Sequence, residues 1–169
     1  MEAAIQKDII QTFKNLNAIL FLFSQEEFNI VPGKDRWSAG QTAQHLVLAC
    51  TGYPELFLGK TEKTDRRYDE KIKDIEALFL NFDIKMDSPD FLKPALIDYD
   101  KDAITASFLK IESDLLLAAQ TSDLTLTCLD FELPGFSEFT IFEWISFALT
   151  HIQRHTKQLN TIFKQVAKS

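Results

Sequence analysis

The feature that most constrains this chain is a repeat of apolar residues near its C-terminus. From Ile141 to Val166, apolar side chains recur at alternating steps of four and three residues, the spacing of one face of an α-helix. His155 takes one position in this series, which is otherwise filled by Ile, Ala, Leu and Val. Thr140 and Glu143 form a capping-box pattern at its start. Because bundles use such a sustained repeat, the pattern predicts a long helix packed in one.

Three further segments carry the same helical period. They are residues 5–23, a segment that opens with the capping-box pair Ser38 and Gln41, and residues 103–119. Residues 55–100 read as a long connection with one short helical candidate, and residues 120–139 as a loop with at most short strands. The long connection lets the second and third bundle helices run parallel. We therefore expect an all-α four-helix bundle.

Length and charge narrow the class of protein. A chain of 169 residues is long enough to bury a core of its own, so we expect a single domain over residues 1–169. The net charge of -7 would repel polyanions, which argues against nucleic acid and anionic membranes as partners. Met1 is followed by Glu2, and the early apolar run at 18–23 is too short to span a bilayer. These features indicate a cytoplasmic protein.

Two other groups of residues receive structural interpretations. Cys50 and Cys128 have no C-x-x-C spacing and are expected to be reduced and buried. The basic residues of the following cluster alternate with acidic ones and are expected to decorate a solvated loop. The cluster comprises Lys60, Lys63, Arg66 and Arg67.

The three histidines are the strongest candidates for a functional site. His151 and His155 lie four residues apart, so on a helix their rings can point at one ion; they can equally be core histidines with satisfied nitrogens or a surface pair. A ring at a seam position is costly to bury without partners. His45 lies near the inward stripe of the second helix and can face the pair. Three neutral imidazoles would leave a fourth coordination position free for water, as in catalytic zinc sites.

Two stretches of the sequence resemble a known family. DRWSAGQTAQHL at 35–46 and FTIFEWISFALTHIQRHTKQL at 139–159, with FLKP at 91–94, are similar to the DinB-like family, also called the YfiT-like metal-dependent hydrolases. The likeness covers nearly the whole chain. It implies a four-helix bundle of up-down-down-up topology. It also implies a divalent ion, often zinc or nickel, whose ligands match His45, His151 and His155.

The resemblance also implies a range of activities. Characterised members include thiol transferases that use bacillithiol or mycothiol-type cofactors and a maleylpyruvate isomerase, in which the ion activates a thiol or water. We therefore expect a transferase or hydrolase that acts on a small molecule, with a low-molecular-weight thiol as a candidate cofactor and a homodimer as a candidate assembly. No catalytic residue is assigned. The alternative is a non-catalytic bundle that binds a small molecule or a partner, with the metal structural or absent.

Residues near the histidines have two interpretations each. Gln158 is either a hydrogen-bond partner of a ligand ring or bound water, or a solvated glutamine. Trp144 either lines the pocket or belongs to the core. Arg154 either meets an anionic substrate or forms a surface ion pair, and Trp37 is expected to cover one end of the bundle. Cys50 lies too far around its helix from His45 to be a fourth ligand.

Overall fold

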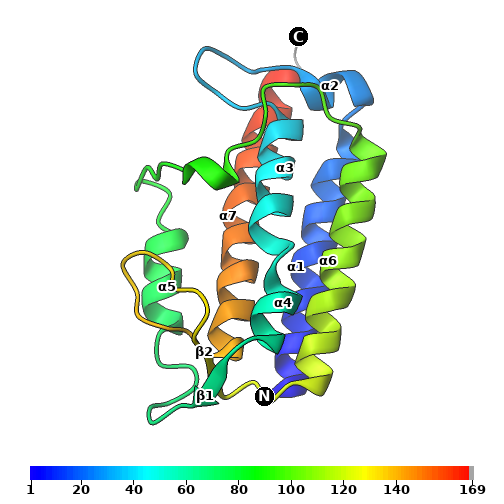
Figure 1. Ribbon diagram of the computed structural model, residues 1–169. Coiled ribbons are helices and arrows are strands. Elements are labelled where there is room, and N and C mark those ends of the chain that lie inside the picture. The colour runs from blue at the N-terminus through cyan, green and yellow to red at the C-terminus, as the bar shows by residue number, and fades with distance from the viewer. Residues whose placement is uncertain (168–169) are drawn as a thin grey trace.

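Four long helices form the body of the molecule. The computed structural model describes residues 1–167 of the chain. The long helices are α1 (Glu2–Leu22), α3 (Ala39–Cys50), α6 (Lys101–Thr121) and α7 (Ile141–Val166). Both α1 and α3 pack against α6 and against α7. Figure 1 shows α1 and α7 running in one direction and α3 and α6 in the other, so the predicted all-α bundle and its up-down-down-up order are confirmed.

Shorter elements close the ends of the bundle and cover one side. They are α2 (Gln25–Asn29), α4 (Tyr53–Leu58), β1 (Thr61–Lys63), α5 (Ile72–Phe79), the 3-10 helix η1 (Asp90–Leu92) and β2 (Leu126–Cys128). The two strands pair in antiparallel fashion, with Thr61 opposite Cys128. The α5 helix packs on the outside of α7. From α5 the chain climbs past α7 and α3 through η1 and then enters α6 (Figure 1).

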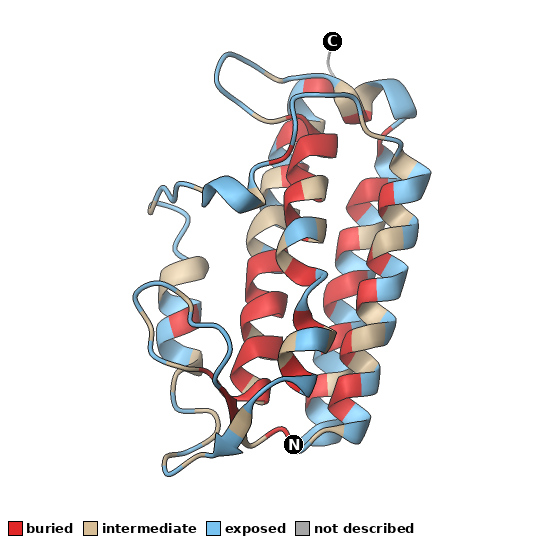
Figure 2. Ribbon diagram, in the orientation of Figure 1, coloured by how far each residue is buried: buried red, intermediate tan, exposed pale blue. Residues whose placement is uncertain are grey.

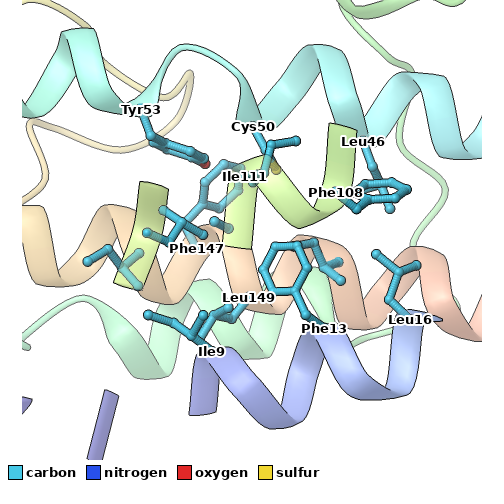
Figure 3. Packing of buried hydrophobic residues seen from close by; sticks show 14 of the residues in the cluster. Ile9, Phe13, Leu16, Leu46, Cys50, Tyr53, Phe108, Ile111, Phe147 and Leu149 are labelled. Carbon is cyan, nitrogen blue, oxygen red and sulfur yellow. The ribbon is translucent and has the colours of Figure 1, made fainter. Parts of the chain in front are cut away.

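The sequence explains where the helices begin and which sides they bury. Complete capping boxes open α2 at Ser24, α3 at Ser38 and α7 at Thr140. Buried residues lie on the facing sides of the long helices (Figure 2). Figure 3 shows Phe13 of α1 and Phe108 of α6 in the interior, and both side chains are fully buried. Within residues 1–167, no helix has a stretch long and apolar enough to cross a membrane.

One expectation about the basic cluster was wrong. The Arg66 guanidinium is mostly buried and forms a bidentate ion pair with Glu143, at 2.7 Å from each Nη to a carboxylate oxygen. Glu143 also accepts hydrogen bonds from the backbone N–H groups of Thr140 and Lys71. Its side chain is fully buried, so its charge needs a cation beside it. Arg66 therefore fastens the loop after β1 to the first turn of α7.

Candidate metal centre

The three histidines meet where α3 packs against α7. The Nε2 atom of His151 lies 3.2 Å from Nε2 of His45 and 3.0 Å from Nε2 of His155. One ligand atom from each of the three rings lies within 4.8 Å of the others. Two nitrogens bound to one tetrahedral zinc ion would be about 3.3 Å apart, given Zn–N distances of about 2.0–2.1 Å. Two of the three nitrogen pairs are therefore spaced as a tetrahedral metal ion would space them.

In two of the three rings, the hydrogen bond made by Nδ1 shows which nitrogen carries the proton. His45 Nδ1 lies 2.9 Å from the Leu92 carbonyl oxygen, and His155 Nδ1 lies 2.7 Å from the Gln158 amide oxygen. Both oxygens only accept hydrogen bonds, so both Nδ1 atoms must donate. In the neutral rings, the Nε2 atoms then carry lone pairs. This arrangement orients metal-ligating histidines in many proteins.

His151 completes the set without a hydrogen-bond partner at its second nitrogen. Its Nδ1 atom is buried and has no partner among residues 1–167. The Phe147 ring stacks on the imidazole with centroids 5.6 Å apart, and Phe79 meets it edge-on. A proton on His151 Nε2 can point well at only one of the two lone pairs beside it. A cation interacts favourably with all three nitrogens, so this donor set fits a divalent ion.

Burial keeps the rings in the neutral form that binds metals. Desolvation by burial is the main cause that lowers the pKa of His45, while its hydrogen bond to Leu92 partly opposes the shift. The pKa of His151 lies well below the usual value, because of burial and then of the neighbouring His155 and His45. Burial, followed by the proximity of His45, lowers the pKa of His155 to about 3. The site is therefore ready to take up a cation at neutral pH.

Three residues that contact His45 were not assigned to the site from the sequence. The Trp37 ring lies 5.2 Å from the His45 ring, centroid to centroid, so Trp37 packs against a candidate ligand. Ser88 Oγ lies 3.4 Å from His45 Nδ1, near the oxygen of Leu92. A backbone carbonyl carries no residue-type signal, so the role of Leu92 is invisible in composition or periodicity. The FLKP stretch at 91–94 contributed to the family resemblance but assigned no role to Leu92.

The structure separates the interpretations of the neighbouring residues. Gln158 does contact a candidate ligand, through the bond to His155. Trp144 is a buried core residue whose ring centroid lies 5.8 Å from that of Phe147, and the Phe147 ring stacks on His151. Its indole nitrogen is another buried polar atom without a partner in the described chain.

Arg154 forms no side-chain ion pair within residues 1–167 and instead contacts the backbone of the connection after α5. Its guanidinium donates to the carbonyl oxygens of Phe79, Asn81 and Ile84, at 2.9, 3.0 and 2.6 Å. These carbonyls lie at the end of α5 and just beyond it. Arg154 thus binds the backbone of the connection, so the expected surface ion pair is not observed.

The cysteines lie apart from this chemistry. Both are free and buried, as expected. Burial raises the pKa of the Cys50 thiol to about 12. Burial, with the nearby Asp130 carboxylate, raises the pKa of Cys128 to about 12 as well. A thiolate is the reactive form of cysteine, so these two side chains are inert structural residues.

The chain is therefore a helical bundle of up-down-down-up order, in which three histidines from α3 and α7 form a candidate metal site. The chain belongs to the DinB superfamily, whose family profile matches residues 8–159. It is also similar to the uncharacterized protein YuaE of Bacillus subtilis (strain 168). The alignment has 28% identity over a length of 169 and covers 95% of each chain. No solved structure matches the chain.

Proposed function

We propose that this protein is a metal-dependent enzyme whose divalent ion is held by His45, His151 and His155. The observation that carries the proposal is the convergence of three Nε2 atoms, two of them on rings whose Nδ1 atoms donate to oxygens. When bound by three imidazoles, such an ion lowers the pKa of a water or thiol at its open coordination position. The chain itself keeps the rings neutral and orients those of His45 and His155 through their Nδ1 hydrogen bonds.

The reaction that fits this site best is transfer or hydrolysis on a small molecule, with zinc or nickel as the ion. The family resemblance supports a thiol as the activated group. Neither cysteine of the chain can supply that thiol, because both are buried and have a raised pKa. A thiol would therefore come from a low-molecular-weight cofactor.

Metal analysis of tag-free protein tests the ligands. We expect about one equivalent of zinc or nickel per chain, lost in His45→Ala, His151→Ala and His155→Ala. Asp114→Asn, on the outer face of α6, is a control that should retain the metal. Undiminished metal in all three histidine variants would refute the site.

Cobalt substitution tests the open position. In Co²⁺-loaded protein, added 2-mercaptoethanol should produce a sulfur-to-cobalt charge-transfer absorption, because a thiolate can enter the free position. The band should not form when cobalt and the thiol are added to His155→Ala, because this variant is expected to bind no metal. A cobalt spectrum that changes with neither the thiol nor azide, a second small ligand, would contradict an open, catalytic site.

A second candidate function is a non-catalytic bundle with a structural ion. It is favoured by the depth of the site, because His45 and His151 are only 4% and 8% exposed and come from different helices. An ion held there would cross-link α3 to α7 like a core contact. A closed cobalt site that binds no thiol, together with a strong loss of stability on chelation, would favour this candidate.

A further inference from the structure

The connection between α5 and α6 touches the histidine site at two separated points. We call residues 80–92 the strap. At its start, Arg154 of α7 donates to the carbonyl oxygens of Asn81 and Ile84, as well as to Phe79 at the end of α5. At its end, the carbonyl oxygen of Leu92 accepts from His45 of α3. The strap therefore links Arg154, which is next to one candidate ligand in the sequence, with the ring of another.

Besides these hydrogen bonds, the strap is held mainly by the packing of η1 against α3. No residue from 80 to 92 is buried, and Phe82, Met86 and Phe91 are large apolar side chains left exposed. Lys157 lies over the Phe82 ring at 3.4 Å from its centroid, which adds one contact near the Arg154 end. Segments with few buried contacts open at low free-energy cost, so the two polar attachments should contribute substantially to keeping the strap docked.

The protonation of the His45 ring couples docking of the strap to metal binding. A ring that binds a cation through Nε2 carries its proton on Nδ1, and a mostly buried N–H group needs an acceptor. That acceptor is the Leu92 oxygen, with Ser88 Oγ beside it. A docked strap thus favours the ligating form of His45, and metal binding favours the docked strap. Coupling of this kind is reciprocal by thermodynamic linkage.

We infer that Arg154 is a positioning residue of the metal site, which acts through the strap and the Leu92 carbonyl on His45. The inference rests on the proposed metal function. Charge alone argues for the opposite effect, since a guanidinium near a cation site repels the cation. Removal of Arg154 should weaken metal binding if it positions the strap, and strengthen it if it acts only by its charge.

Zinc affinity, measured by competition with a chromophoric chelator, tests the inference. Arg154→Ala should bind zinc about tenfold more weakly than the wild type, the lower end of the usual loss for groups that orient metal ligands. Lys164→Ala removes the same charge from an exposed position in the last turn of α7 and should leave the affinity unchanged. Arg154→Lys keeps the charge without the planar fork and should recover only part of the loss. Wild-type or tighter zinc binding by Arg154→Ala would overturn the inference.

A second variant leaves α7 intact. Pro89→Gly, Asp90→Gly and Phe91→Gly together loosen η1, and should also weaken zinc binding about tenfold. The matched control places three glycines at 95–97, an exposed stretch beyond the contact with His45, and should bind zinc as the wild type does. Equal zinc affinity in the two triple-glycine variants would contradict a role for the strap.

Amide hydrogen exchange reports the strap directly. The N–H groups of Leu92 and Lys93 donate within the η1 turn, to the oxygens of Pro89 and Asp90. Zinc should slow their exchange about tenfold or more in the wild type and leave it unchanged in His155→Ala. Unchanged exchange in protein shown to hold zinc would overturn this inference alone. A wild-type protein that binds no zinc would remove the proposed function and this inference together.

Discussion

At the scale of single residues, the partners of the histidines differ in how far away they lie along the chain. Gln158 is three residues from His155 on the same helix, so helical geometry alone suggested their contact. Leu92 is 47 residues from His45 and offers only a backbone oxygen. Periodicity locates partners on the same helix, whereas a loop carbonyl becomes visible only when the chain is folded. This difference explains why Gln158 could be predicted and Leu92 could not.

Gln158 gives a prediction at this scale. Gln158→Ala removes the acceptor that orients His155, so we expect zinc affinity to fall about tenfold. Gln158→Glu keeps an oxygen in reach and adds negative charge near the cation, so it should bind zinc at least as tightly as the wild type. Asn160→Ala, which changes an exposed amide on the same helix, is the control. The same chelator competition measures all three, and an affinity of Gln158→Ala equal to that of the control would contradict the assignment.

At the scale of elements, the first turn of α7 combines a local and a distant contact. The Thr140–Glu143 capping box was predicted from four consecutive residues and is confirmed. The ion pair of Glu143 with Arg66 spans 77 residues and was missed, because an alternating charge cluster usually marks a solvated loop. The same carboxylate thus starts the longest helix and holds the loop after β1 against it.

Neutralising one carboxylate should destabilise the fold more at the buried ion pair than at an exposed one. Glu143→Gln leaves the Arg66 guanidinium without its counter-charge and weakens the helix cap, so we expect the free energy of unfolding to fall by about 3 kcal/mol. Asp114→Asn breaks the exposed pair with Lys110 on α6 and should cost about 0.3–0.5 kcal/mol. Urea denaturation at neutral pH measures both changes. Losses of similar size in the two variants would show that burial does not strengthen the inner pair.

Short elements mark the limit of sequence reasoning. The α2 helix has a complete capping box from Ser24 to Glu27, a signal that was present in the sequence but not used. The pairing of β1 with β2 joins segments more than 60 residues apart and has no local period. The four long helices were predictable because each repeats its apolar spacing over several turns. Three-residue strands offer no such repeat.

At the scale of the whole molecule, the length of one connection made the parallel arrangement of α3 and α6 predictable. A link of more than 40 residues between α3 and α6 permits parallel neighbours, as observed (Figure 1). The path of this link was not predictable, because breakers at Pro89 and Pro94 locate turns without showing which surface they cover. That path decides which backbone oxygens reach the histidines.

Metal removal gives the prediction for the whole molecule. Zinc at about 100 times its dissociation constant should stabilise the fold by about 2.7 kcal/mol, if it binds only the folded chain. For a chain of this length, we expect EDTA to lower the melting temperature by about 5–10 °C. His45→Ala should melt at the same temperature with and without EDTA. A wild-type melting temperature that ignores chelation would contradict metal binding to the native bundle.

The position of the ligands along the chain has a consequence for biosynthesis. His45 lies in the first third of the sequence, whereas His151 and His155 lie in the last helix. A polypeptide still on the ribosome cannot offer all three rings until residue 155 has left the exit tunnel. Premature termination before residue 155 yields a product without all three histidines, so ion uptake must follow synthesis of the chain through that residue.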